Sequence, residues 1–130
     1  MVKDRLSAQG FAVQDIKRIN RREFDVVTVR DGVIWNVQCK NNFLDLSTVD
    51  ADAHRFARYN RALVTSYEKA LDKDRRREHL LQDKLSLDKI QHVVVARFPV
   101  VCDSRRIVPF SRLDGFTAVA QVLLAQSASA

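Results

Sequence analysis

The chain has few cysteines and glycines and no long apolar segment, and each shortage excludes a class of protein. Two cysteines, Cys39 and Cys102, are too few for a disulfide scaffold, so we expect reduced thiols in a cytoplasmic protein. Three glycines do not provide a glycine-rich phosphate loop. Apolar runs such as 93–96 and 122–125 are far shorter than the ~20 residues of a membrane span, and the charges directly after Met1 argue against a signal peptide.

Several common catalytic signatures are also missing from the sequence. There is no HExxH helix, and no serine or cysteine lies beside a histidine suited to act as its base. The three histidines, His54, His79 and His92, do not have the spacing of metal ligands, so we do not expect a zinc site.

The overall composition is typical of one globular domain. Its 130 residues are 46% apolar and 29% charged, which argues against intrinsic disorder and against a fibrous repeat. A chain of this length buries a core without disulfides or metal ions. We expect a single domain over residues 1–126, followed by a frayed tail over 127–130.

The net charge favours an anionic partner. Lysine and arginine number 22 against 16 aspartates and glutamates, which gives a formal charge of +6. Nucleic acid is one such partner, although many soluble proteins are this basic for reasons of solubility alone.

The first part of the chain predicts a short helix and a strand. Residues 3–9 resemble the last turns of a helix that Gly10 ends, and 11–19 alternate loosely in hydrophobicity, as a strand does. A basic connection over 17–22 follows.

A hairpin is the clearest element of the sequence. Residues 23–30 and 33–40 are rich in β-branched side chains, and the dipeptide Asp31-Gly32 between them is a strong signal for a tight two-residue turn.

A long helix is expected after a loop that contains Asn41, Asn42 and Ser47, with Asp50 as its first residue. Its apolar stripe has helical spacing and consists of Phe56, Tyr59, Leu63, Tyr67, Ala70 and Leu71. The charged run 72–77 is interpreted as solvated surface, and Leu80, Leu81 and Leu85 indicate one or two further helical turns.

The last part predicts two strands and a helix. A buried strand is expected over 91–101, with Pro99 ending its regular pairing, and a short strand over 107–110. Ser111 and Asp114 resemble a capping box that opens a final helix. The element order predicts an α/β fold with a mixed central β-sheet flanked by helices.

The turn fixes the register of the hairpin and brings polar residues together. Because Arg30 faces Val33 across a two-residue loop, Asp25 should lie opposite Gln38, and Glu23 opposite Lys40. Alternation places these four polar side chains on one face of the hairpin. The other face is expected to be core; it contains Phe24, Val26, Thr28, Trp35, Val37 and Cys39.

This polar cluster has the chemistry of a cation site. Directly opposed residues place their Cβ atoms ~5 Å apart, so the oxygens of Asp25 and Gln38 are able to share one divalent cation. Hard oxygen ligands suit Mg²⁺ or Mn²⁺, and Lys40 beside the cation is suited to orient water or to stabilise a phosphorane.

An acidic residue followed by a hairpin and Gln38-Cys39-Lys40 resembles the PD-(D/E)XK nuclease superfamily, in a QXK variant similar to its Mrr-type branch. The resemblance covers about residues 1–100. It implies a restriction-endonuclease-like αβββαβ core and a Mg²⁺-dependent or Mn²⁺-dependent endonuclease acting on DNA. It also implies that Asp25 is the central metal ligand, Gln38 the second, the backbone carbonyl of Cys39 a third, and Lys40 the catalytic lysine.

The chain departs from that family in two respects. Gln38 replaces a carboxylate, which lowers the negative charge of the site, and the family's glutamate in the first helix has no counterpart. Asp4 is the only acid near that helix, and Glu23 is a substitute catalytic carboxylate if it does not simply pair with Lys40 or Arg22. The chain is then active, an inactive relative, or a fragment that lacks the start of the first helix.

The predicted partner is DNA and not a membrane. Its backbone is expected to meet two sets of cations, Lys17, Arg18, Arg21 and Arg22 before the hairpin and Arg55 and Arg58 on the long helix. A non-catalytic nucleic-acid-binding or assembly module is the alternative function, and an exposed sheet face with ordinary ion pairs is the structural one. A homodimer and further domains of a longer chain both stay open.

Overall fold

The Asp31-Gly32 turn organises the sheet. A computed structural model describes residues 1–40, 53–97, 100 and 102–128. Both turn residues have positive φ, 52° and 75°, as the hairpin prediction requires. They join β4 (Val26–Arg30) to β5 (Val33–Lys40), and Arg30 faces Val33 as predicted.

Three further strands complete a mixed sheet. They are β1 (Ala12–Gln14), β6 (Lys89–Ala96) and β7 (Ile107–Pro109), and the strand order is β1-β4-β5-β6-β7. The pairs β1–β4 and β4–β5 are antiparallel, whereas β5–β6 and β6–β7 are parallel. The prediction of a mixed sheet flanked by helices is confirmed.

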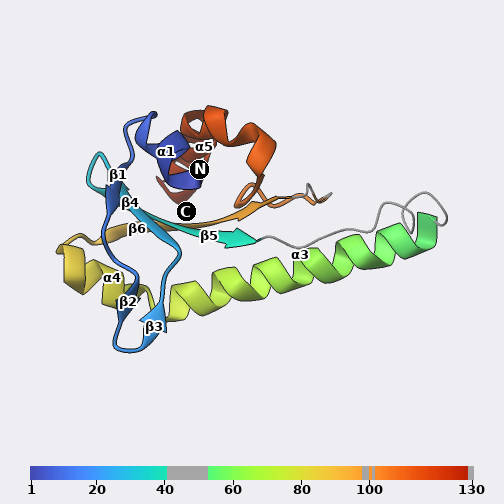
Figure 1. Cartoon of the computed structure of the whole chain (residues 1–130), viewed down its shortest axis with the longest axis horizontal. Helices are drawn as coiled ribbons and strands as arrows, with labels where there is room; N and C mark the ends of the chain where they lie inside the picture. Colours follow the sequence, from blue (N-terminus) through green and yellow to red (C-terminus); the bar gives the residue numbers. More distant parts are fainter. Residues whose placement is uncertain (41–52, 98–99, 101, 129–130) are drawn as a thin grey trace.

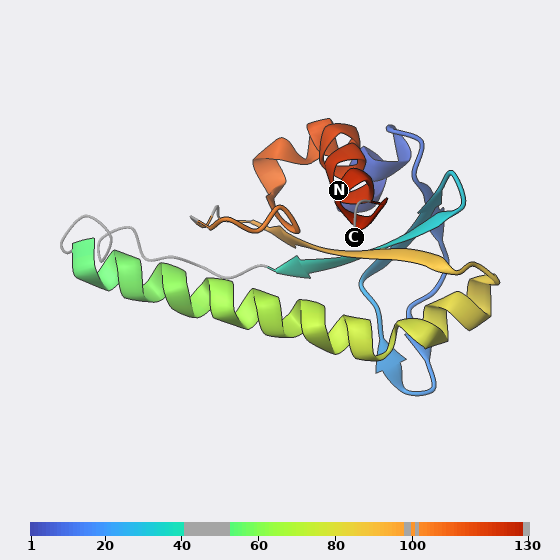
Figure 2. The same cartoon turned by 180° about the vertical axis from the view of Figure 1, so that it is seen from behind.

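Helices cover both faces of this sheet (Figures 1 and 2). On one face lie α1 (Val2–Ser7), the 3₁₀ helix η1 (Phe110–Gly115) and α5 (Phe116–Ala128). On the other lie α3 (Ala53–Arg76) and α4 (Glu78–Leu85). None of the helices within the described ranges is long and apolar enough to cross a membrane.

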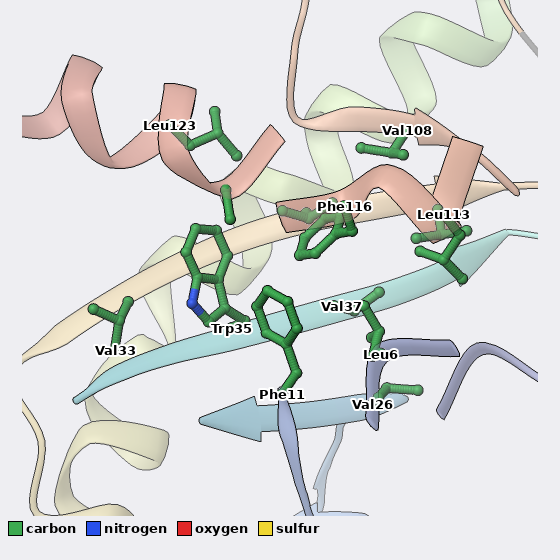
Figure 3. Close-up of a cluster of buried hydrophobic side chains, with 13 residues drawn as sticks. Leu6, Phe11, Val26, Val33, Trp35, Val37, Val108, Leu113, Phe116 and Leu123 are labelled. Atoms are coloured by element: carbon green, nitrogen blue, oxygen red, sulfur yellow. The ribbon is translucent and has the colours of Figure 1, made fainter. Parts of the chain in front are cut away.

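The face under α1 and α5 holds the largest hydrophobic cluster (Figure 3). Its centre is a trio of aromatic rings that meet edge to face. The centroids of Phe11 and Trp35 are 6.0 Å apart, those of Phe11 and Phe116 are 5.1 Å apart, and those of Trp35 and Phe116 are 5.8 Å apart. These rings are almost fully buried, so they join the first strand, the hairpin and the last helix into one core.

The opposite face has two smaller clusters. One lies under α4 and consists of Ile16, Phe24, Val27, Ile34 and Leu81. The other lies under α3 and consists of Tyr67, Leu71, Val94, Ala96 and Ile107. The apolar stripe predicted for the long helix is thus buried in its C-terminal half, whereas Tyr59 is 40% exposed.

A small second hairpin corrects the prediction for the N-terminal part. The strand expected over 11–19 is split into β1 and β2 (Arg18–Ile19), and β2 pairs with β3 (Arg22–Glu23). Asn20 and Arg21 form its turn at φ values of 48° and 67°. Asparagine is one of the few residues that tolerate this conformation, so a turn signal was present in what was interpreted as a connection.

Two other sequence predictions need correction. Ser111 and Asp114 do not form a capping box, because they lie inside η1, and Asp114 accepts a hydrogen bond from Arg5 at 2.9 Å. Helix α5 extends to Ala128, two residues into the tail expected over 127–130. The predictions for Asn41, Asn42, Ser47, Asp50 and Pro99 fall outside the described residues.

The sheet face under α4 also contains a buried polar chain. Asn36 Nδ2 lies 3.1 Å from His92 Nδ1, and His92 Nε2 lies 2.9 Å from a Glu78 carboxylate oxygen. This pattern fits a neutral imidazole that carries its proton on Nε2. Burial lowers the pKa of His92 below its ordinary value of 6.5, against the opposing effect of Glu78.

Phe116→Ala tests the aromatic core. Removing this fully buried ring leaves a cavity between two other rings, so we expect the unfolding free energy to fall by about 3–5 kcal/mol. Leu124→Ala on the same helix is the control: Leu124 is 37% exposed, so we expect a loss below about 1 kcal/mol. Urea unfolding followed by circular dichroism measures both, and equal losses would contradict this account of the core.

The buried imidazole predicts a pH dependence of stability. Because folding favours neutral His92, its contribution is complete above the unfolded-state pKa near 6.5 and is lost as the pH falls through the lower folded-state pKa. We expect His92→Gln to flatten the decline of unfolding free energy below pH 6.5. His79→Gln, at an exposed position of α4, should leave the decline as in the wild type.

Candidate active site

The four polar residues predicted from the hairpin line one pocket. It has a volume of about 370 Å³ and contains Glu23, Asp25, Gln38 and Lys40. The rest of its lining consists of Arg21, Arg22, Lys73 and Arg77. The lining residues therefore come from the segment around β3, from the C-terminal end of β5 and from the last turns of α3.

Asp25 reaches the pocket from a bend and not from a strand. β4 begins only at Val26, so the predicted ladder pair with Gln38 is absent from the register. The Asp25 carboxylate instead accepts a hydrogen bond of 2.9 Å from the backbone N–H of Cys39. The carboxylate thus satisfies the backbone N–H of Cys39, which has no ladder partner because β4 does not extend this far. This contact fixes Asp25 at the edge of β5.

The same bend moves Phe24 to the other face of the sheet. Phe24 was expected on the face of Trp35, but it packs with Ile16, Val27 and Leu81 under α4. Alternation fails because residues 24 and 25 do not continue the strand.

Gln38 is held by a buried carboxylate. Its Nε2 donates a hydrogen bond of 2.7 Å to Oδ2 of Asp74, and Asp74 is only 1% exposed. Because the amide nitrogen is directed to Asp74, the amide oxygen is the branch that stays available to the pocket. Asp74 therefore gives Gln38 the orientation that a cation ligand requires.

Arg77 balances the charge of Asp74 and ties the hairpin to the helix. Its Nε and one terminal nitrogen donate to Oδ1 of Asp74 at 3.1 and 2.8 Å. The guanidinium also donates to the backbone carbonyl of Glu23 at 2.7 Å and lies 4.6 Å from the centre of the Phe24 ring. Both Asp74 oxygens are thus occupied, so this carboxylate supports the site and is not itself a free ligand.

Glu23 and Lys40 flank these residues. Glu23 forms an exposed ion pair with Arg18 at 2.6 Å, and not the pair with Lys40 or Arg22 that the sequence suggested. Lys40 is half-buried, and its backbone carbonyl accepts a hydrogen bond from Arg97, which anchors the end of β5 to the residue after β6.

Cys39 differs in part from its prediction. Its side chain is exposed and not in the core, because β5 extends beyond the packed part of the sheet there. The backbone N–H and C=O of one strand residue point to the same side, so the Cys39 carbonyl is directed to the flank where Asp25 lies. Partial desolvation and the Asp25 carboxylate raise the pKa of the thiol to about 11, so the sulfur stays protonated at neutral pH.

The pocket contains oxygen donors of the kind that suit a hard divalent cation, but only two of the described residues that line it are carboxylates. Asp25, Glu23 and the Gln38 amide are oxygen donors that line one pocket, and oxygen is the ligand type that Mg²⁺ and Mn²⁺ prefer. Within the described part of the chain, no three histidine, cysteine, aspartate or glutamate side chains gather as a metal site. Asp4, on α1, is 93% exposed and forms an ion pair with the N-terminus.

The predicted nucleic-acid-binding residues fall into two groups. Arg21 and Arg22 line the pocket, and Lys17 and Arg18 line a neighbouring hollow of about 590 Å³ that shares Glu23 and Asp25 with it. The other group, Arg55 and Arg58, lies near the N-terminal end of α3, whereas the pocket is at the C-terminal end.

The sequence analysis missed Asp74 and its partner Arg77. Both belong to the charged run that was interpreted as solvated surface. Asp74 follows Tyr67 and Leu71 at helical spacing, so it continues the buried stripe of α3. An acid in phase with an apolar stripe is a signal that was overlooked, because a buried carboxylate needs partners and therefore marks a polar contact.

Comparisons with protein-family models, with curated proteins and with solved structures found no match to this chain.

Two aspartates on one helix allow a matched test of the buried contact. Asp74→Ala leaves Arg77 and Gln38 without their shared partner, so we expect a loss of about 3–5 kcal/mol in unfolding free energy. Asp72→Ala removes the same charge from an exposed pair with Arg75, so we expect a loss of less than about 1 kcal/mol. Denaturant unfolding measures both, and similar losses would contradict the role given to Asp74.

Proposed function

We propose that the protein is a metal-dependent endonuclease, or a nuclease domain, which hydrolyses phosphodiester bonds in DNA on a restriction-endonuclease-like core. The observation that carries the proposal is the single pocket that Asp25, Gln38 and Lys40 share. Apart from the small β2–β3 hairpin and the short helix α4, the order α1, β1, β4, β5, α3, β6 is that of an αβββαβ arrangement.

The charge of the pocket supports a phosphate ligand. Five cationic side chains line it against two carboxylates, and one of those carboxylates, Glu23, is paired with Arg18. Arg77 is balanced by Asp74, so the surplus comes from the other four cations. This surplus attracts a phosphodiester, while Asp25 provides the local negative charge that a cation needs.

Asp25, Gln38 and the Cys39 carbonyl would hold Mg²⁺ or Mn²⁺. When bound, such an ion neutralises charge on the scissile phosphate and lowers the pKa of a coordinated water. Asp25 has one carboxylate oxygen on the Cys39 N–H, and its other oxygen carries the ligand role. Glu23 is the second carboxylate at the rim, where it is able to accept a proton from water.

Lys40 has the electrostatic role. Water attacks phosphorus, the bond from phosphorus to the leaving oxygen breaks, and that oxygen takes up a proton. Negative charge grows on the phosphoryl oxygens during this step, and a half-buried ammonium stabilises it more strongly than an exposed one does. Lys17, Arg18, Arg21 and Arg22 would contact the backbone on either side.

A non-catalytic nucleic-acid-binding module is the second candidate. The small number of carboxylates at the pocket favours this candidate. Asp4 is 93% exposed and does not line the pocket. Gln38 occupies a position where an acid would bind a cation more strongly. This candidate predicts binding that weakens steeply with salt and does not change with Mg²⁺.

Cleavage of supercoiled DNA separates the two candidates. With Mg²⁺ or Mn²⁺ we expect the wild type to nick or linearise the plasmid, and Lys40→Ala and Asp25→Asn to lower the rate at least about a hundredfold. Lys84→Ala, at an exposed position of α4, is the charge-matched control for Lys40 and should cleave as the wild type does. Full activity of Lys40→Ala would rule out the assignment, and no cleavage by a folded wild type would favour the binding module.

A further inference from the structure

The outward face of α3 carries a line of cations, of which only Lys73 lines the pocket of the candidate active site. Arg58, Arg61, Lys69, Lys73 and Arg76 are all exposed, and their spacing places them within about 120° of one another around the helix. We call this set the α3 ridge. Tyr67 and Leu71 point from the opposite side of the helix into the sheet. The ridge spans 18 residues, or about 27 Å at 1.5 Å per residue.

Among the described residues, the cations of the ridge lack the ion pairs of an ordinary solvated helix face. Such faces alternate charges at a spacing of three or four residues, and each pair stabilises the helix. Here Lys69 and Lys73 are four apart with the same sign, which destabilises a helix. Two exposed acids of α3, Glu68 and Asp72, lie beside the ridge, and Asp72 is bonded to Arg75 at 2.9 Å. Because neither acid forms an ion pair with a ridge cation, the charge of the ridge is available to an external anion.

A hollow in the middle of the ridge allows close approach. It has a volume of about 490 Å³ and is lined by the cations Arg58, Arg61 and Lys69 and by the small residues Ala62, Thr65 and Ser66. Among the described residues that line it there is no carboxylate. A phosphate that enters this hollow meets three cations.

We infer that the α3 ridge binds the phosphate backbone of duplex DNA on one side of the cleavage site; the inference rests on the proposed function. Lys73 belongs to the ridge and also lines the pocket, so the two surfaces are continuous. A duplex is favoured over a single strand because it is rigid over this distance and holds its phosphates in place without a loss of chain entropy.

The geometry sets the length of duplex that the ridge contacts. Fifteen residues separate Lys73 from Arg58, or about 22 Å along the helix. At 3.4 Å per base pair this distance corresponds to about six or seven base pairs beyond the scissile phosphate. The ridge therefore selects a substrate with a long flank on that side, and a short duplex reaches only its first cations.

Two double variants with the same net charge test the ridge. Arg61→Ala with Lys69→Ala removes two cations from the hollow, and neither residue lines the pocket of the candidate active site. Lys84→Ala with Lys89→Ala removes two exposed cations from α4 and β6, at the end of the molecule away from the start of α3 (Figure 2). Alanine favours helix at Arg61, Lys69 and Lys84, and Lys89 is an exposed first residue of β6, so we expect all variants to fold, which circular dichroism checks.

Binding is measured by fluorescence anisotropy on a hairpin DNA with a 20-base-pair stem, in EDTA, between 50 and 200 mM salt. We expect the ridge variant to weaken binding and to reduce the slope of log K against log salt by about 1.8, or 0.9 per lost phosphate contact. The control variant should keep the wild-type slope. Equal changes in both variants, or none in the ridge variant, would overturn the inference.

The length and type of nucleic acid provide a second arm. We expect the wild type to bind the 20-base-pair stem more tightly than a 5-base-pair stem, and the ridge variant to lose that preference. Ridge-dependent binding of a single strand that equals binding of the duplex would overturn the assignment to duplex DNA.

Cleavage in Mg²⁺, run in parallel, keeps the two proposals apart. Ridge-dependent binding without any cleavage contradicts the nuclease proposal alone, whereas cleavage with unaltered binding by the ridge variant contradicts the ridge alone.

Discussion

A buried carboxylate on the long helix, that of Asp74, joins the parts of the protein that surround the pocket. It accepts hydrogen bonds from Gln38 on β5 and from Arg77 at the end of α3, and Arg77 in turn holds the backbone at Glu23. A charge this deeply buried is stable only with such partners. The helix, the sheet and the small hairpin therefore keep one relative position, and the pocket between them depends on it.

The second constraint is the early end of β4. A regular hairpin would continue its ladder to the last residues of β5, where backbone groups would pair with each other. Instead the chain bends at Asp25, and a side-chain carboxylate takes the place of the missing strand partner on Cys39. At the bend, main-chain pairing is therefore replaced by a side-chain contact of Asp25. This places the acid at the edge of the sheet, in the same pocket as Gln38 and Lys40. Interrupted ladders of this kind are common next to functional sites.

Several cationic side chains lie around the pocket that this bend helps to form. Arg21, Arg22 and Lys73 surround the pocket, and the α3 ridge continues from Lys73 along the helix. On its inner side α3 packs against the sheet, so the helix has two separate roles. Its buried stripe positions Gln38 through Asp74, whereas its exposed stripe is the α3 ridge, which we propose as the contact surface for a polyanion.

The sequence by itself determined the hairpin, its register, the mixed sheet and the meeting of Asp25, Gln38 and Lys40, because these follow from local turn chemistry and from the two-residue period of a strand. Only the tertiary structure decided that Asp25 leaves the ladder, that Phe24 changes face and that Asp74 is buried. The last two depend on contacts between residues that are distant in the sequence, such as Arg77 with Phe24 or Asp74 with Gln38. Such partners come from residues 36 to 54 positions away in the chain, and no local pattern encodes contacts over that separation.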